Sequence, residues 1–197
     1  MSSIGRNLIL AYHGCEKQIG LNLVNQTTFP EASKNSYDWL GTGMYFWEGS
    51  ESRAWDFINN LKENPNPQKK SIIEPFVIGA VLDLKNCLDL TDSKSIRYVK
   101  AGYEFYKDDL EASDTKILEN KDPIKSESKD KLLRHLDCKV INVTCSLQED
   151  SGTMFDSVRS VFFEGDELYE KAGFYEKTHI QIAVRNFDCI KGFFLPR

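Results

Sequence analysis

The spacing of apolar residues along the chain predicts several short buried strands. Runs of consecutive apolar residues, bounded by polar or turn-forming residues, are typical of strands covered on both faces. Such runs occur at residues 8–12, 44–47, 75–84, 178–184 and 190–195. The last two flank a turn at residues 186–188 and are expected to form a hairpin. A further strand is expected at residues 161–163, where the chain enters a turn.

Other segments show the three-to-four-residue spacing of amphipathic helices. Helices are expected at residues 15–23, from Ser50 onward, across residues 96–110 and within residues 132–147. The helix that starts at Ser50 carries its apolar stripe at Ala54, Phe57, Ile58 and Leu61. Residues 25–38 are predicted to form a loop. Residues 112–130 are charged and poor in apolar side chains, which predicts a mobile loop or lid.

Composition agrees with one domain that spans residues 1–197. The chain has 197 residues, of which 41% are apolar and 28% charged, enough to enclose one sizeable core. No apolar run reaches the roughly 18 residues of a membrane span, and the start lacks the layout of a signal peptide. We therefore expect a cytoplasmic protein with no membrane partner. Five cysteines without a C-x-x-C pair are expected to be reduced, mostly packed, and not to bind zinc.

Charge is unevenly distributed. The net charge is −5, which argues mildly against a protein that coats nucleic acid. Residues 177–197, however, carry four Lys or Arg residues against a single Asp. A solvated strand face is the simpler interpretation of this basic end, and a phosphate-binding surface is the alternative.

Two short motifs bring candidate chemistry to the strand ends. Tyr12-His13-Gly14 closes the first strand, and Gly41-x-Gly43-x-Tyr45-Phe46 opens the second. Taken singly, His13 and Tyr45 are more often structural residues, and a glycine pair is often only a turn. A strand follows the glycines where a dinucleotide-binding G-x-G-x-x-G motif needs a helix, so the pattern excludes a Rossmann site.

Together, the two motifs resemble the diphtheria-toxin and poly(ADP-ribose)-polymerase class of ADP-ribosyltransferases, whose signature is a His-Tyr-Glu triad. The resemblance implies an α+β, ADP-ribosyltransferase-like fold in which two small, mostly antiparallel sheets form an NAD groove flanked by helices. It implies that His13 holds a ribose hydroxyl, that the backbone of Gly14 grips the nicotinamide amide, and that Tyr45 stacks on the nicotinamide ring. Gly43 belongs to the same implied NAD-binding set.

The family also places a second aromatic residue from the next helix against the nicotinamide. Trp55 is the candidate, because it lies one position away from the apolar stripe of that helix. Trp47 and Phe57 are the alternatives within the uncertainty of the register.

The chain departs from the family at the third triad position. Aligning the closing strands with the last strands of the family puts Gln181 where the catalytic glutamate is expected. An amide can accept a hydrogen bond from the 2′-hydroxyl of the ribose, but it cannot take a proton. Glu176, just before the strand, and Glu164 are therefore candidate bases, with solvated acids as the equally weighted alternative.

NAD, as co-substrate, needs cations for its pyrophosphate but no metal. Arg53, Arg159 and Arg185 are the candidates for this role, although a surface salt bridge is the ordinary expectation for each.

The resemblance implies an NAD-dependent ADP-ribosyltransferase with a macromolecular acceptor. Nucleic acid, RNA or DNA, is slightly favoured over protein, because the glutamate is absent and the chain end beside Gln181 is basic. By analogy the protein is expected to be a bacterial toxin or anti-phage effector, with an antitoxin or chaperone as a further partner. The alternatives are an NAD glycohydrolase and a catalytically inactive module that binds NAD or ADP-ribose.

Overall fold

The structure is a computed structural model that describes residues 8–66, 70–122 and 131–197. The expected α+β class is confirmed, since a mixed sheet is combined with four α-helices in these residues. The elements in chain order are β1 Ile9–Glu16, α1 Lys17–Val24, β2 Met44–Glu48, α2 Glu51–Glu63, β3 Pro75–Leu82, β4 Cys87–Asp89, α3 Ser93–Ala112, α4 His135–Asp150, β5 Ser157–Phe162, β6 His179–Val184, the short 3-10 helix η1 Phe187–Cys189 and β7 Ile190–Phe194.

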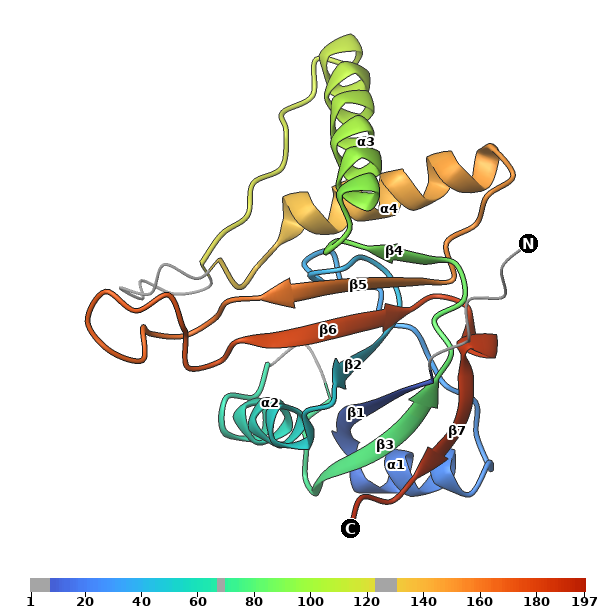
Figure 1. Cartoon of the computed structure of the whole chain (residues 1–197), viewed down its shortest axis with the longest axis vertical. Helices are drawn as coiled ribbons and strands as arrows, with labels where there is room; N and C mark the ends of the chain where they lie inside the picture. Colours follow the sequence, from blue (N-terminus) through green and yellow to red (C-terminus); the bar gives the residue numbers. More distant parts are fainter. Residues whose placement is uncertain (1–7, 67–69, 123–130) are drawn as a thin grey trace.

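The strands form one seven-stranded sheet in the order β4-β5-β6-β2-β1-β3-β7. The pairing is mostly antiparallel, as expected, and β4 and β5 are the parallel pair. The expectation of two separate sheets is wrong, because β1 and β2 join the two groups of strands through Ala11↔Glu48 and Tyr12↔Trp47. Figure 1 shows that β5 and β6 run in a different direction from β1, β3 and β7, so the single sheet is strongly twisted at this junction.

The expected hairpin of the last two strands is also wrong. Strand β6 lies between β5 and β2, whereas β7 pairs with β3 at the far edge of the sheet. The backbone N–H groups of Arg185 and Asn186 both donate to the carbonyl of Asp156, at 2.9 Å each. The carbonyl of Cys189 then accepts from the N–H of Asp83 at 2.8 Å. These bonds direct the chain from the end of β6 to the end of β3.

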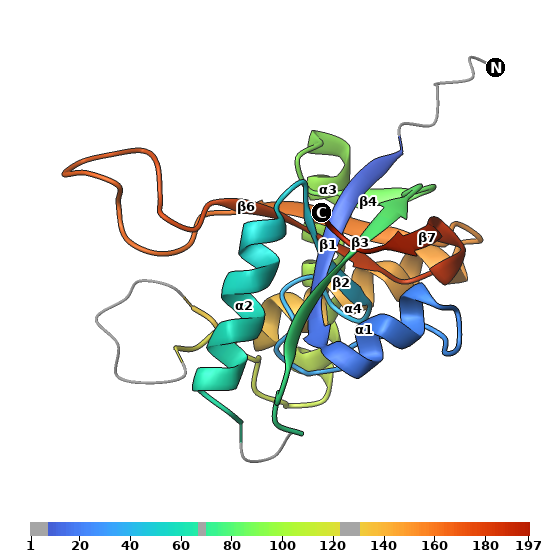
Figure 2. The ribbon, with the colours of Figure 1, turned by 90° about the horizontal axis from the view of Figure 1, so that it is seen from below.

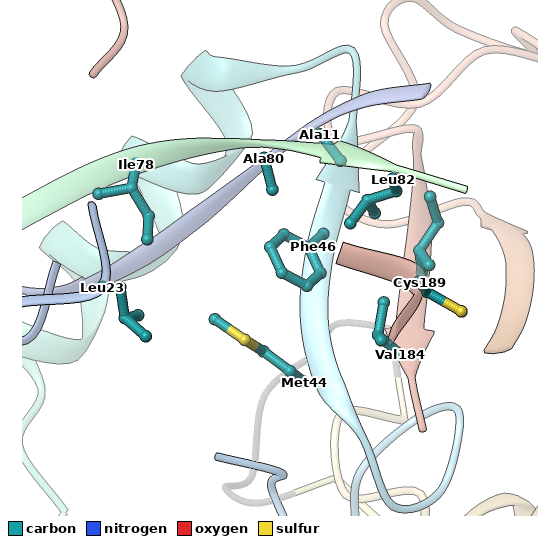
Figure 3. Packing of buried hydrophobic residues seen from close by; sticks show 10 residues of the cluster. Ala11, Leu23, Met44, Phe46, Ile78, Ala80, Leu82, Val184 and Cys189 are labelled. Carbon is teal, nitrogen blue, oxygen red and sulfur yellow. The ribbon is translucent and has the colours of Figure 1, made fainter. Parts of the chain in front are cut away.

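Apolar side chains cover both faces of the sheet. On one face, α1 packs over a cluster whose members are buried or nearly so (Figure 3), namely Ala11, Leu23, Met44, Phe46, Ile78, Ala80, Leu82, Ile182, Val184 and Cys189. On the other face, α4 contributes Ile141 and Cys145 to a second cluster over β5 and β6. The alternation of side chains along each strand places neighbouring residues in different clusters.

Helix α2 packs directly on β1 and β3. The Oγ atom of Ser50 accepts a hydrogen bond from the N–H of Arg53 at 3.4 Å, so Ser50 is the N-cap and the predicted helix start is confirmed. Ala54 and Ile58 are buried from this helix against Trp47 and Val77. The close approach sets the space available beside the end of β1.

The connection between β5 and β6, residues 163–178, forms an arm that projects from the body in both views (Figures 1 and 2). Its two sides are joined by backbone hydrogen bonds, including Leu168 N–H to Phe174 O at 3.0 Å. Four large side chains on the arm are exposed, namely Phe163, Leu168, Tyr169 and Phe174. It also carries five acidic residues against two lysines.

The remaining predictions concern the loop region, the cysteines and the membrane. Within the expected loop at 112–130, residues 113–122 contain no helix, and Lys121 forms an isolated antiparallel bridge with Leu133. Residues 123–130 lie outside the described residues. All five cysteines are free, and all but Cys87 are buried, so the prediction that they are mostly packed is confirmed. Among the helices of the described ranges, none combines the length and apolar character needed to cross a membrane.

Candidate functional site

The candidate site lies where β1 and β2 separate. The N–H of Gly49 donates to the carbonyl of Leu10 at 2.9 Å, so the even-numbered residues of β1 direct their backbone groups toward β2. Continuing the register Tyr12↔Trp47 would place Gly14 opposite Tyr45, but the pairing between the two strands stops at Tyr12. The N–H and C=O of Gly14, a buried residue, are therefore directed toward β2 at a point where the ladder has ended, and this break in the ladder is the gap between β1 and β2.

The imidazole of His13 takes the hydrogen bond that the ladder would have supplied. Its Nδ1 lies 2.7 Å from the carbonyl oxygen of Tyr45, and because a carbonyl can only accept, Nδ1 carries the proton. Burial lowers the pKa of His13, and the bond to Tyr45 opposes this effect only in part. The ring is thus neutral at pH 7, with Nε2 as an acceptor for a donor such as a hydroxyl group.

The ring of Tyr45 is held by the glycine-containing loop before it. Its hydroxyl donates to the carbonyl of Gly41 at 2.7 Å and accepts from the N–H of Leu40 at 2.9 Å. Gly41 has a φ of +73°, and an added Cβ there would lie 2.7 Å from Oδ1 of Asn142. The backbone of Gly43 exchanges hydrogen bonds with Ser33, at 2.8 and 3.1 Å. Burial raises the pKa of Tyr45 well above its ordinary value, so the phenol stays neutral.

Gln181 lies on the same sheet face as Tyr45 and Trp47. The register pairs Trp47 with Gln181 and Tyr45 with Ala183, and paired residues in adjacent strands share a face. His13 belongs to the opposite face, where its ring lies 5.7 Å from that of Phe46. The gap is therefore bordered by His13 on one side of the sheet and by Tyr45, Trp47 and Gln181 on the other.

The aromatic residues of α2 lie on two flanks of its buried stripe. Trp55 packs against the cluster that contains Ala54 and Ile58, and its Nε1 donates to Glu51 at 3.1 Å. Phe57, about 200° further around the helix, packs on Trp47 with ring centroids 4.8 Å apart. The pair formed by Trp47 and Phe57 is thus adjacent to Gln181, because Trp47 and Gln181 are paired across β2 and β6, whereas Trp55 projects from another side of α2.

Arg53 and Glu164 belong to a second cluster at the start of α2, together with His179. Arg53 Nη2 lies 3.1 Å from Glu164 Oε2, and the same carboxylate oxygen lies 3.9 Å from His179 Nδ1. The His179 side chain is 1% exposed, its Nδ1 donates to Lys177 O at 2.6 Å, and burial lowers its pKa to about 4. Its Nε2 has no hydrogen-bond partner within the part of the chain that the structure describes. Glu164 and Arg53 are thus engaged with each other.

The other charged candidates lie away from the gap. Arg159 is bound through two nitrogens to Glu48, at 2.6 and 3.0 Å, and through a third to Asp89, at 2.9 Å. Arg185 donates from Nη1 to the carbonyl of Thr42 and to Asn142, both at 3.1 Å. Glu176 is exposed on the arm. Both arginines are therefore engaged in hydrogen bonds within the fold, and neither projects freely into solvent.

A large pocket lies beside this region, and the sequence did not predict it. It has a volume of about 620 Å³ and is lined by residues of α3, α4 and β5, together with Trp39 and Arg134. Arg134 stacks on Trp39 with its Cζ 4.1 Å from the ring centroid, and on Phe162 at 5.0 Å. The spacing of apolar residues predicted a helix across residues 96–110, which supplies one wall of the pocket, but not the wall opposite it.

Comparison with models of known protein families, with curated proteins and with solved structures finds no significant match. Within residues 8–66, 70–122 and 131–197, no group of three or more His, Cys, Asp or Glu side chains is arranged to hold a metal ion. The gap between β1 and β2, with its neighbours, is the candidate functional site of the described residues.

Proposed function

We propose that the protein is an NAD-dependent ADP-ribosyltransferase. The observation that carries the proposal is the hydrogen bond from His13 Nδ1 to the Tyr45 carbonyl at the point where β1 and β2 separate. This bond holds a neutral imidazole next to the backbone groups of Gly14, which are directed into the gap. The bond joins the ring of His13 to the backbone of Tyr45, and Gly14 follows His13 directly, whereas the ring of Tyr45 lies on the other face of the sheet. These are the three residues for which the family resemblance implies contact with the nicotinamide half of NAD.

The proposed reaction requires of the protein mainly that it position NAD. The nicotinamide ring of NAD is positively charged and becomes neutral when its bond to the ribose breaks, so it is already a good leaving group. The protein therefore has to orient the sugar and stabilise the developing oxocarbenium ion. In the proposal, His13 Nε2 accepts a hydrogen bond from a ribose hydroxyl, and the N–H and C=O of Gly14 pair with the carboxamide. Tyr45, fixed by its hydroxyl, supplies the ring contact, with Trp47 and Phe57 favoured over Trp55 for the second aromatic residue.

Gln181 is proposed to hold the 2′-hydroxyl of the same ribose. Because its amide cannot accept a proton, the acceptor group must be nucleophilic by itself or lose its proton to another residue. Glu164 is the better placed of the two carboxylates, since it contacts His179, two residues before Gln181 on the same face of β6. It would first have to exchange its ion pair with Arg53. Nucleic acid remains the favoured acceptor over protein.

The test is incubation of the purified protein with NAD labelled in the adenosine half, together with separate RNA, DNA and protein fractions. Nicotinamide release and transfer of label are measured in parallel. We expect release with transfer to one fraction, loss of both in His13→Ala, and no loss in the matched variant His135→Ala. Gln181→Glu is expected to increase nicotinamide release, because a carboxylate stabilises the oxocarbenium ion better than an amide does.

The outcomes separate the alternatives. Release without transfer would favour a glycohydrolase that uses water as acceptor. Binding of NAD without release, even in Gln181→Glu, would favour an inactive binding module, and neither binding nor release would contradict the proposal as a whole.

A further inference from the structure

We propose that the pocket enclosed by α3, α4 and β5 binds a base of a single-stranded nucleic acid, which is the acceptor of the ADP-ribosyl group. The assignment of this ligand as acceptor rests on the proposed transferase function. The assignment of the pocket as a nucleotide site does not, because it rests on the shape, composition and charge of the pocket itself.

The pocket adjoins the part of the candidate site where an acceptor would have to enter. Ser160 lines the pocket and pairs with Gln181 across β5 and β6, so both residues belong to the same sheet face. The gap with His13 and Gly14 lies on the other side of Gln181, beyond β2. A sugar held by Gln181 would thus have the nicotinamide site on one side and the pocket on the other. The volume of about 620 Å³ is within the range of sites for nucleotide-sized ligands.

The walls of the pocket suit a flat, aromatic ligand. Trp39 and Phe162 form an edge-to-face pair with centroids 4.8 Å apart, and the guanidinium of Arg134 lies against both rings. Tyr103 and Phe163 line the pocket as well, and Phe163 is 56% exposed. Unstacked bases are commonly bound by aromatic side chains and by the planes of arginine side chains, because every base has a π-face.

The charge of the pocket favours a phosphate-bearing ligand. Its lining carries Lys100 and Arg134 against Asp137, a net charge of +1 in a chain whose total is −5. Arg134 Nε is buried and has no hydrogen-bond partner among the described residues, so a donor remains to be satisfied. Arg134 Nη1 lies 3.5 Å from Asp137, at the limit of a hydrogen bond. A nucleotide combines a flat ring with an anionic group, whereas an apolar peptide side chain would leave both cations without a new partner.

The experiment measures binding without NAD first. Short, fluorescently labelled single-stranded RNA and DNA of mixed sequence are titrated with the protein, and binding is followed by anisotropy at several salt concentrations. We expect Tyr103→Ala to weaken binding about tenfold through lost stacking. Lys100→Ala should weaken it too and reduce the slope of log K against log salt by about 0.7, the value for one phosphate contact on a single strand.

Matched control variants come from the same helix. Phe105→Ala and Lys107→Ala remove an exposed aromatic residue and an exposed lysine of α3 that do not line the pocket. Both should bind the oligonucleotides as the wild type does. Circular dichroism of each variant checks that α3 is still folded, and a lysine-rich peptide pool labelled in the same way tests a protein acceptor.

Weakened binding in the pocket variants with unchanged controls supports the proposal, whether or not NAD is turned over. Absence of oligonucleotide binding, equal binding by all four variants, or saturable binding of the peptides alone would overturn it. Label transfer is then measured with the bound oligonucleotide. If pocket binding is confirmed but NAD yields no nicotinamide, the proposed enzymatic function fails while the nucleotide site stands.

Discussion

Substitution of Gly14 by alanine tests the contact between β1 and α2 on which the candidate site is built. A Cβ atom at this position would lie 2.7 Å from the carbonyl oxygen of Ala54 and 2.9 Å from Cβ of Ile58. The first of these atoms is backbone and the second is the root of a side chain, so neither can rotate away. Helix α2 would have to move outward, although Ala54 and Ile58 are 0% and 1% exposed in its present position.

The expected cost follows from two opposing effects. Overpacking of a tight contact costs about 1–3 kcal/mol. Alanine in a strand is otherwise favoured over glycine by about 0.5–1 kcal/mol. The clash should prevail, so we expect Gly14→Ala to lower the free energy of unfolding by about 1–2 kcal/mol. Gly192→Ala is the matched control, because a Cβ there meets nothing within 4 Å and should leave stability unchanged or slightly raised.

Urea denaturation followed by tryptophan fluorescence measures both variants. A double-mutant cycle with Ile58→Ala adds a second test, because an outward shift of α2 in Gly14→Ala would already loosen the packing of the Ile58 side chain beyond its Cβ atom. The cost of Ile58→Ala should therefore be smaller in the Gly14→Ala background, with a coupling of about 0.5–3 kcal/mol. If Gly14→Ala were as stable as Gly192→Ala, α2 would not rest on β1 as described, and the argument for the shape of the gap would fail.

Two further predictions concern the cluster at the start of α2. The folded-state pKa of His179 is about 4, below the ordinary 6.5, so the unfolded chain binds the proton first as pH falls. The free energy of unfolding should hence decrease by up to about 3 kcal/mol between pH 6.5 and 4. In His179→Gln, urea denaturation at pH 7 and pH 4.5 should show a smaller decrease in this free energy. The decrease that remains in the variant is expected from His13, whose pKa is lowered as well. Arg53→Ala should cost about 1–3 kcal/mol, because the mostly buried carboxylate of Glu164 loses its ion pair with Arg53. Lys17→Ala breaks the exposed ion pair between Lys17 and Glu74 and should cost under about 1 kcal/mol. Equal losses of stability in Arg53→Ala and Lys17→Ala would contradict this prediction.

Apolar patterning was sufficient to predict most elements, but not how they pair. Strand β3 begins at Pro75, as predicted, and α2 follows its Ser50 cap. Strand β4 has only three residues, which is too short to produce a pattern. The hairpin prediction for β6 and β7 failed because the bonds to Asp156 and Asp83 that separate these strands come from distant parts of the chain. Pairing depends on such contacts, and the spacing of apolar residues does not record them.

In the candidate site, too, some features were predicted from the sequence and others depend on the folded chain. The proximity of His13 and Tyr45 was expected from the family resemblance, and the hydrogen bond between them is a property of the folded chain. The ion pair between Arg53 and Glu164 spans 111 positions, so no local signal could have indicated that the arginine is engaged. Trp39, Arg134 and Phe162 likewise come from three separate segments before they stack. Such clusters of charged and aromatic residues form only when the strands pair in their final register, so the linear sequence does not indicate them.

The early end of the pairing between β1 and β2 also has a consequence for association between molecules. It creates a strand edge in the interior of the sheet, whereas the strand edges of most sheets lie at the perimeter, where foreign chains can add to them and start aggregation. Helix α2 packs over this stretch, with Ala54 and Ile58 against Gly14. A strand from another molecule would have to displace the helix to reach the edge. The fold thus ends a ladder in the middle of the sheet while it keeps the resulting edge closed to other protein chains.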